Sequence, residues 1–336
     1  MTSAYSTKFY ENQRSGSRQS ADRIVPLVVD LVRPKSVVDI GCGVGTWLAS
    51  FSAQGSEDIF GVDGEYVDRR MLQIPESRFL AGDLTRPISL GRRFDLVCCL
   101  EVAEHLAAES AGTLIDSITS LGPVILFSAA APYQGGTNHV NEQWPEYWTT
   151  LFKERGYLPV DCFRTAIWND PAVEWWYAQN VLLFLEQAHL ESLGTNDPLR
   201  RLFLGTHNPP LALVHPRGYL DKALALRLCK DVVDIVPSGE SLILVADSMA
   251  TEFPIRDMRP FLERDGVYWG SPADDDEAIR ELERMRSSGS AFIVFSWLSF
   301  WWLDYYSGLH QYLRARFRCV RQNESLVAFD LRTKTE

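Results

Sequence analysis

The sequence predicts an α/β protein whose first and larger part is a mostly parallel sheet covered by helices on both faces. Apolar, β-branched segments alternate with segments in which apolar residues recur at helical spacing. The strand segments are apolar throughout, which is typical of strands that are buried on both faces. A length of 336 residues and a change of composition after residue 187 indicate a second, smaller α/β domain.

Helices and strands are expected in a regular order through the first 187 residues. The helical segments end at a glycine or before a Gly-Pro pair, and the strand segments end in turns rich in glycine and aspartate. The expected helices are 19–32, 46–55 and 114–121. The expected strands are 36–40, 58–63, 78–84, 94–100 and 124–129, followed by 157–166 and 178–186, which would close the sheet as a hairpin.

The predicted domain limits follow from these patterns. Residues 1–187 form the first domain, in which 1–35 supply an N-terminal lid and helix. Residues 188–212 mix short helical pieces with Gly and Pro and are expected to be a linker. Residues 213–336 form the second domain. Its expected elements are strands at 241–247, 291–297 and 326–331 and a charged helix at 274–289.

Composition excludes several classes of protein. The net charge is −11 and no cluster of Lys and Arg stands out, which disfavours binding to nucleic acid or to an anionic membrane. The longest apolar run, 291–303, has 13 residues and is too short to span a bilayer. The N-terminus is polar, and the six cysteines lack paired metal spacing. We therefore expect a cytoplasmic protein with reduced thiols.

Three glycines, Gly41, Gly43 and Gly45, directly follow the first predicted strand. Glycines at this place let the backbone turn sharply into a helix and approach a ligand closely, as in dinucleotide sites. The spacing, however, is G-x-G-x-G rather than G-x-G-x-x-G, and Asp39 precedes the first glycine by two positions. A carboxylate there disfavours a pyrophosphate and suits a cationic ligand, which argues against a nicotinamide dehydrogenase.

Two further aspartates end the next two predicted strands. Asp63 is placed to accept hydrogen bonds from both hydroxyls of a ribose, and Asp83 is placed to accept one from an exocyclic amine. A ligand with a ribose, an adenine and a positive charge but no phosphate is S-adenosylmethionine.

Four motifs in this order, "VVDIGCGVG", "GVDG", "AGDL" and "FDLVCCLEVAEHL", resemble those of class I S-adenosylmethionine-dependent methyltransferases of bacterial small-molecule or saccharide type. The resemblance covers roughly residues 5–187 and implies a Rossmann-like sheet and an active enzyme. It also implies the residues that contact the cofactor. They are Asp39, Gly41, Gly43 and Gly45 at the methionine end, Asp63 and Gly64 at the ribose, Asp83 and Leu84 at the adenine, and Glu101 lining the site after the fourth strand.

The N-terminal segment has two interpretations. Similar bacterial methyltransferases carry such a segment before the first helix, where it closes over the cofactor, and Tyr10, Arg14, Ser15 and Ser20 are then the candidate contacts. Alternatively, the segment is a disordered polar tail and Ser20 is the N-cap of the first helix.

Candidate catalytic residues lie after the fourth and fifth strands, at the edge of the sheet where ligands bind. His139, in "NHVNEQWPEYW", is the candidate general base, and Glu142, together with Asn141, would orient the acceptor. His105, in "EVAEHL", is a second catalytic candidate. Trp144 and Trp148 are expected to wall the pocket. Alternatively, His105 packs at the start of a helix and His139 is a surface residue of a loop, without a catalytic role.

A metal is an alternative. Glu101, Glu104 and His105 form E-x-x-E-H, which together with His139 resembles the metal-dependent small-RNA 2′-O-methyltransferases. Two carboxylates and two imidazoles suit a divalent cation. In related enzymes the first glutamate instead serves the cofactor, so a metal site stays undecided.

An aromatic cluster precedes the last strand of the first domain. Trp168, Trp175, Trp176 and Tyr177 would form either a platform for a sugar or planar acceptor, or part of the core or a domain interface. We favour the core, where such clusters occur more often.

The second domain resembles an α/β module appended to bacterial glycosyltransferases and methyltransferases, in "DDDEAIRELERMRSSGSAFIVFSWLSFWWLDYY" and "RFRCVRQNESLVAFDL". Asp304 and His310 are weak site candidates, and packing against the first domain or against a second subunit of a homo-oligomer is the preferred interpretation.

These observations predict an S-adenosylmethionine-dependent methyltransferase that acts on a hydroxyl of a small molecule or saccharide in a bacterial biosynthetic pathway of natural products or glycans. An N- or C-methyltransferase of a natural product and a non-catalytic cofactor-binding scaffold are the alternatives.

Overall fold

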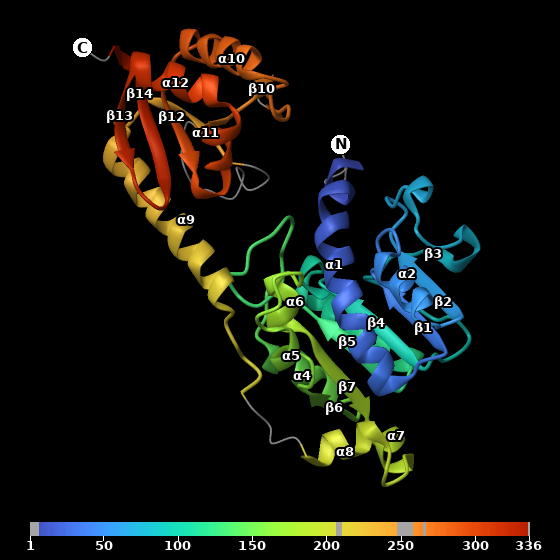
Figure 1. Ribbon diagram of the computed structural model, residues 1–336. Helices are drawn as coiled ribbons and strands as arrows, with labels where there is room; N and C mark the ends of the chain where they lie inside the picture. Colours follow the sequence, from blue (N-terminus) through green and yellow to red (C-terminus); the bar gives the residue numbers. More distant parts are fainter. Residues whose placement is uncertain (1–6, 206–209, 247–257, 265–266, 335–336) are drawn as a thin grey trace. The chain divides into compact units, whose positions relative to one another are not determined.

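The chain forms two compact units, Met1–Gly218 and Tyr219–Glu336, each with its own sheet (Figure 1). The computed structural model describes residues 7–205, 210–246, 258–264 and 267–334.

The sheet of the first unit has seven strands in the order β3-β2-β1-β4-β5-β7-β6. The first five strands in this order, β3, β2, β1, β4 and β5, run parallel to one another, whereas β7 runs antiparallel to both β5 and β6. This arrangement confirms the predicted Rossmann-like α/β sheet. The strands are β1 (Ser36–Ile40), β2 (Asp58–Asp63), β3 (Phe79–Ala81), β4 (Leu96–Leu100), β5 (Val124–Ser128), β6 (Tyr157–Val160) and β7 (Leu182–Glu186).

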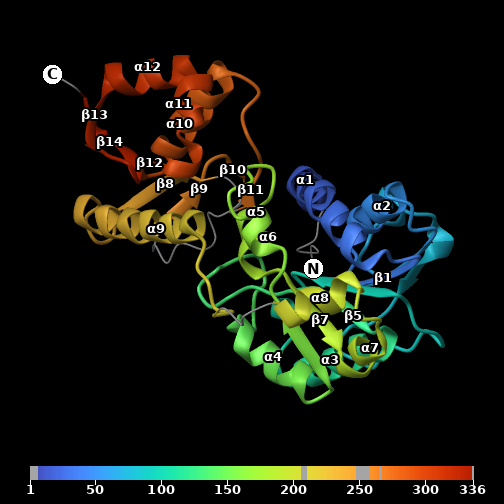
Figure 2. The same cartoon turned by 60° about the horizontal axis from the view of Figure 1, so that its bottom comes forward.

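Helices cover both faces of this sheet (Figure 2). Successive residues of β1 point to opposite faces, so Val37 packs in one core and Val38 in the other. The core around Val37 includes apolar residues of α1 (Thr7–Val32) and α2 (Thr46–Ala53). The core around Val38 includes residues of α3 (Ala111–Leu121) and α4 (Pro145–Lys153). Burial on both faces explains why the strands are apolar throughout.

The predicted closing hairpin is correct in its pairing and wrong in its extent. β6 and β7 pair antiparallel, but the residues between them form α5 (Arg164–Ile167) and α6 (Trp175–Asn180). Phe163 and Ile167 are both buried, and their separation of four residues is helical spacing.

The helix that we predicted at 19–32 begins at Thr7, so Ser20 is not its N-cap. Ser20 is buried inside the helix, where its hydroxyl donates to the carbonyl of Gly16 at 2.8 Å and accepts from the backbone N–H of Glu174 at 3.0 Å. The helix is therefore tied to the segment before α6. The side chains of Tyr10, Arg14 and Ser15 lie outside the described part of the chain.

Two helices occupy most of the segment that we expected to be a linker. α7 (Gln187–Ser192) and α8 (Pro198–Gly205) bury Leu190 and Leu199 in the same core as α1. Apolar residues at one face of each short helix account for this packing, which ties residues 187–205 to the first unit.

The second unit has a five-stranded sheet in the order β13-β14-β12-β8-β9 and a separate two-stranded sheet, β10-β11. The three predicted strands and the charged helix are present. The strands are β8 (Ser241–Val245), β9 (Met258–Pro260), β10 (Glu263–Arg264), β11 (Val267–Tyr268), β12 (Ser290–Ser296), β13 (Phe317–Gln322) and β14 (Leu326–Lys334). The helices are α9 (Pro216–Ile235), α10 (Asp275–Ser287), α11 (Trp301–Tyr305) and α12 (Ser307–Arg316).

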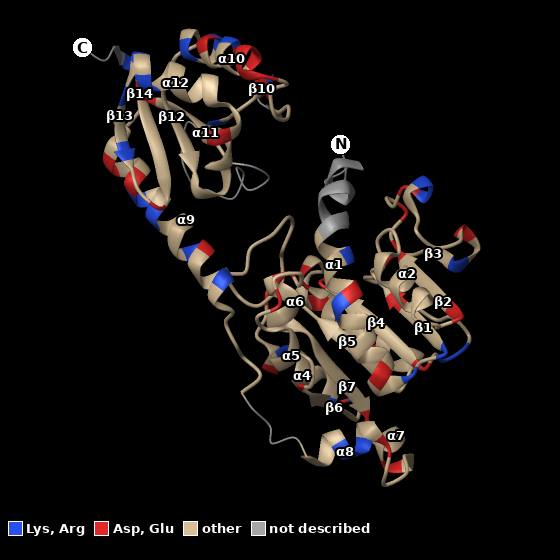
Figure 3. Ribbon diagram, viewed as in Figure 1, with Lys and Arg blue, Asp and Glu red and all other residues tan. Residues whose placement is uncertain are grey.

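Charge distribution accounts for the ends of α10 (Figure 3). Acidic residues fill its first turn, Arg284 and Arg286 lie in its last turn, and the Asp274 side chain caps the N–H of Glu277 at 2.8 Å. Each arrangement complements the helix dipole. Among the described helices of both units, none has an apolar stretch long enough to cross a lipid bilayer.

Candidate cofactor and active site

The glycine loop between β1 and α2 requires glycine at its first and third positions. Gly41 and Gly45 have φ angles of 85° and 81°, in the left-handed region. A Cβ atom at Gly41 would lie 2.3 Å from a methyl group of Val102, and one at Gly45 would lie 3.0 Å from Ile74. Val102 and Ile74 thus fill the places that side chains would take, so the loop can pack closely at the end of β1 only with glycine at these two positions.

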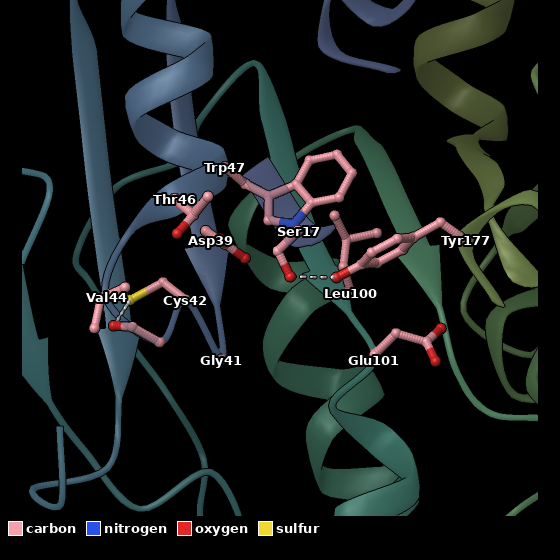
Figure 4. A pocket seen from close by; sticks show the side chains of 11 residues that line it. Ser17, Asp39, Gly41, Cys42, Val44, Thr46, Trp47, Leu100, Glu101 and Tyr177 are labelled. Carbon is pink, nitrogen blue, oxygen red and sulfur yellow. Dashed lines mark hydrogen bonds between the residues drawn. The ribbon is translucent and has the colours of Figure 1, made fainter. Parts of the chain in front are cut away.

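A cavity of about 110 Å³ lies over this loop (Figure 4). Residues from separate parts of the first unit line it, namely α1, β1, the glycine loop, α2, the end of β4 and α6. The lining residues that bear on its chemistry are Ser17, Asp39, Gly41, Gly43, Glu101 and Tyr177. Three of the predicted cofactor contacts before β2, Asp39, Gly41 and Gly43, therefore border one cavity, together with Glu101.

Asp39 is a buried carboxyl group beside a second one. Burial, and then the neighbouring Asp63, raise the pKa of Asp39 to about 8. The protein alone therefore favours the neutral form of Asp39, and a cationic ligand in the cavity would restore its charge. This is the electrostatic behaviour expected for a site that receives a positively charged group.

Asp63, at the end of β2, already accepts three hydrogen bonds. Its Oδ2 accepts from the N–H of Gly43 at 2.6 Å, and its Oδ1 accepts from the N–H of Gly64 and the hydroxyl of Tyr66, both at 2.6 Å. Burial raises its pKa, and these hydrogen bonds oppose the rise. The Tyr66 hydroxyl thus binds one of the two oxygens that we predicted to accept from a ribose, and no motif in the sequence indicated this contact.

A second cavity, of about 490 Å³, lies beyond Asp63. The exposed side chain of Asp83 accepts hydrogen bonds from the backbone N–H and hydroxyl of Thr85, and Leu84 supplies a buried apolar wall. The two predicted adenine contacts thus share one cavity with Gly64. Its lining consists of Gly64, Glu65, Tyr66, Ala81, Gly82, Asp83, Leu84 and Leu106.

Glu101 has a strained backbone and a fixed side chain. Its φ angle is 53°, and its N–H donates to the carbonyl and the hydroxyl of Ser128 at 2.9 and 3.1 Å. Its carboxylate accepts from the amide groups of Gln134 at 3.0 Å and Asn180 at 3.2 Å. We did not predict these two amides, which are 33 and 79 residues away in sequence.

The loop between β5 and α4 places His139 beside Glu142. His139 Nδ1 lies 3.0 Å from Glu142 Oε1, and the Glu142 carboxylate accepts from the N–H groups of Tyr133 and Gly135, both at 2.7 Å. Burial alone would raise the pKa of Glu142, but the hydrogen bonds from His139 and the backbone outweigh it and the pKa is lowered. An ionised carboxylate thus orients one nitrogen of the imidazole.

His105 and Glu104 lie next to this pair. The rings of His105 and His139 meet edge to face with centroids 4.8 Å apart. Burial, and then His139, lower the pKa of His105 to about 4, and burial, and then Glu101, raise the pKa of Glu104 well above its usual range. Ligand atoms of Glu104, His105 and His139 all lie within 4.8 Å of one another. Of the four residues in the predicted metal set, Glu101 is not in this group.

One expectation about the segment after His139 is wrong. Trp148 does not wall a pocket, because it is 2 % exposed and its ring packs 5.5 Å from that of Phe127 in the core. Asn141 is buried, its N–H donates to the carbonyl of Glu104, and its side chain accepts from Gln143. These contacts hold the loop in shape, and the role of Asn141 toward an acceptor stays a prediction.

The aromatic cluster before β7 is divided between the site and the core. Tyr177 lines the cavity, where its hydroxyl lies 3.4 Å from that of Ser17 and its ring meets Trp47 edge to face. Trp168 packs on the ring of His215, and Trp176 packs against the core. The cluster therefore contributes one residue to the cavity and otherwise serves packing.

The site candidates of the second unit have structural contacts. His310 Nδ1 lies 3.1 Å from the carbonyl of Leu303, and its Nε2 accepts from Arg314 at 2.8 Å. Both nitrogens are thus occupied within α11 and α12.

An open glycine loop above β1, acidic residues at the ends of β1, β2 and β4, and a seven-stranded sheet with an antiparallel β7 together define a class I methyltransferase. Residues 10–180 match the family described as "Methyltransferase domain", and the chain belongs to this family.

One curated protein is similar to part of the chain. Magnesium-protoporphyrin O-methyltransferase of Synechocystis sp. (strain ATCC 27184 / PCC 6803 / Kazusa) is 30% identical over 129 residues, which are 35% of this chain and 55% of that protein. The chain thus spans about half the length of this curated relative.

Solved structures with a similar fold include two methyltransferases that act on sugars. The sugar N-methyltransferase KedS8 from Streptoalloteichus sp. ATCC 53650 is 16% identical, with a TM-score of 0.43, over 56% of this chain and 97% of its own. The amino pentose methyltransferase CalS10 from Micromonospora echinaspora is 15% identical, with a TM-score of 0.40, over 55% of this chain and 100% of its own.

Proposed function

We propose that the enzyme transfers the methyl group of S-adenosylmethionine to a hydroxyl of a small molecule or saccharide, with His139 as the general base. The contact between His139 Nδ1 and Glu142 Oε1 at 3.0 Å carries this proposal. A carboxylate that holds one imidazole nitrogen leaves the other to accept a proton, which is the usual arrangement of a base and the group that orients it.

The proposed reaction is a single displacement. An oxygen lone pair of the acceptor forms the new O–C bond while the C–S bond breaks and its electron pair stays on sulfur, giving S-adenosylhomocysteine. The hydroxyl proton passes to His139 as the oxygen loses electron density. Burial, and then His139, lower the pKa of His105 to about 4, so we assign His105 a supporting place beside His139.

Contacts between the loop and the cavity support this assignment. Gln134 belongs to the same loop as His139 and bonds to Glu101, which lines the cavity with Asp39. The base is therefore connected to the place where the methionine end of the cofactor would bind. The cofactor contacts that we propose are Asp39, Gly41, Gly43, Gly45, Asp63, Gly64, Asp83, Leu84 and Glu101.

Charge and relatedness support the class of acceptor. A net charge of −11 disfavours polyanionic acceptors such as nucleic acids. The curated relative is named an O-methyltransferase, which favours oxygen over nitrogen or carbon as the methylated atom. We place the reaction in a cytoplasmic biosynthetic pathway of natural products or glycans, with any homo-oligomer formed through residues 213–336.

An assay of the enzyme with a panel of hydroxylated small molecules and saccharides tests this function, and the release of S-adenosylhomocysteine measures turnover of each acceptor. His139→Ala should lower kcat by a factor of about 10² to 10⁴, the usual size of general-base catalysis. Glu142→Gln should lower kcat less, and the affinity for S-adenosylhomocysteine should change little in both variants. Unchanged turnover in His139→Ala would contradict the assignment, and binding without turnover on any acceptor would favour a scaffold.

A divalent cation held by Glu104, His105 and His139 is the second candidate mechanism, because these three side chains converge. The low pKa of His105 keeps its imidazole neutral and suited to bind a cation. Burial raises the pKa of Glu104, so its carboxyl group would have to lose a proton before it could bind the cation. A cation there would lower the pKa of the acceptor hydroxyl. We expect EDTA to leave turnover unchanged, and loss of turnover that Mg²⁺ or Mn²⁺ restores would favour the cation.

A further inference from the structure

The Glu101 carboxylate links the cofactor cavity to the loop that carries His139. Glu101 lines the cavity opposite the glycine loop (Figure 4). Its Oε2 accepts from Gln134, which belongs to that loop, and its Oε1 accepts from Asn180 at the end of α6. Glu101 therefore lies between the group proposed to face the methionine end, Asp39, and the loop proposed to present the acceptor.

Buried amides hold both donors in place. Asn180 also donates to Gln134 Oε1 at 2.8 Å, and its own Oδ1 accepts from Gln179 at 3.0 Å. Gln179 in turn accepts from the N–H of His215 at 2.8 Å. Asn180 and Gln179 are each 5% exposed. Since each amide is fixed by the next, the carboxylate of Glu101 has a defined orientation.

The backbone of Glu101 also indicates a constrained position. A non-glycine residue with φ of 53° is disfavoured and persists only where its surroundings fix it, as the two contacts from its N–H to Ser128 do here. Such residues gather at functional sites.

We propose that Gln134 and Asn180 are positioning residues that aim the Glu101 carboxylate at the sulfonium centre of S-adenosylmethionine. The methyl group must lie between the cofactor and the acceptor, and Glu101 both lines the cavity and bonds to Gln134 of the loop that carries His139. A carboxylate there attracts the sulfonium charge, which S-adenosylhomocysteine lacks. The site thereby binds the charged cofactor in preference to the neutral product and favours product release. The inference rests on the proposed cofactor site.

Calorimetry with S-adenosylmethionine and, separately, S-adenosylhomocysteine tests the inference on the full chain. Glu101→Gln should weaken S-adenosylmethionine binding about tenfold and change S-adenosylhomocysteine binding by less than about twofold. Gln134→Leu and Asn180→Leu should shift the ratio of the two affinities in the same direction by a smaller factor. Glu109→Gln removes an exposed carboxylate eight residues downstream and is the matched control, with no change expected.

The outcomes separate this inference from the function on which it rests. If Glu101→Gln weakens both ligands equally, or neither, Glu101 does not sense the sulfonium and the inference is wrong while the cofactor site stands. If the wild type binds neither ligand, the cofactor site itself is wrong. Should Asn180→Leu fail to fold, as judged by its circular dichroism, Gln134→Leu decides whether the amides position Glu101, because an unchanged ratio in that variant excludes it.

Discussion

At the scale of single residues, the cofactor site depends on carboxyl groups whose charge the protein alone disfavours. Asp39 is buried next to Asp63, and its pKa is raised to about 8. A cationic ligand stabilises the ionised form of Asp39, so binding near neutral pH must drive a proton from this group into solution. The site therefore couples cofactor binding to proton release.

We expect S-adenosylhomocysteine, whose ammonium group is cationic, to release up to one proton on binding at pH 6.5, because free Asp39 is protonated there. Affinity should then rise with pH up to about pH 8 and level off above it. Calorimetry in two buffers of different ionisation enthalpy measures the released proton. Asp39→Asn should abolish the release, and a wild-type enzyme that releases none would contradict the coupling.

Residues that act through local motifs were predictable, and those that act through distant contacts were not. Asp39 lies next to the last residue of β1, Asp63 ends β2 and Asp83 follows β3 by two residues, so the order of motifs along the chain sufficed to place them near the ends of these strands. Tyr66 and the amides of Gln134 and Asn180 act across connections whose course is set by tertiary packing. No spacing in the sequence marks them.

At the scale of elements, the fixed spacing of apolar residues predicted the sheet and several of its helices, but failed for short helices. The segments 164–167 and 175–180 are too short to show a helical period, and their apolar residues resemble strand residues. Likewise, α7 and α8 were hidden among Gly and Pro residues. Tertiary contacts with α1 decide where these helices pack.

Leu199 tests whether α8 belongs to the core of the first unit. It is 4% exposed and packs in the core that includes α1, so Leu199→Ala should lower the free energy of unfolding by about 2 to 4 kcal/mol. Leu204, 73% exposed on the same helix, is the matched control, and Leu204→Ala should change it by less than about 0.5 kcal/mol. Urea unfolding followed by tryptophan fluorescence measures both, and equal effects would place α8 outside the core.

At the scale of the whole molecule, the proposed chemistry lies in the first unit. The cofactor cavities, the His139–Glu142 pair and the amides around Glu101 all lie before Gly218. The domain limit at residue 187 stays a prediction, but residues after this limit form hydrogen bonds with residues before it. Arg164 donates to the carbonyl of Leu211, and the N–H of His215 donates to Gln179.

A chain that ends at Gly218 should therefore fold and bind S-adenosylhomocysteine within about threefold of the full-length affinity. A chain that ends at Glu186 keeps all seven strands of the first unit but loses Leu190 and Leu199, so α1 would expose apolar surface. It also loses the hydrogen bond from His215 to Gln179, so the amides near Glu101 would lose a partner. It should unfold at a lower urea concentration and bind more weakly. Calorimetry and urea unfolding of the two truncated chains beside the full-length protein make the comparison. If the chain ending at Gly218 is folded but has lost binding, residues 219–336 contribute to the site and the assignment of the chemistry to the first unit is wrong.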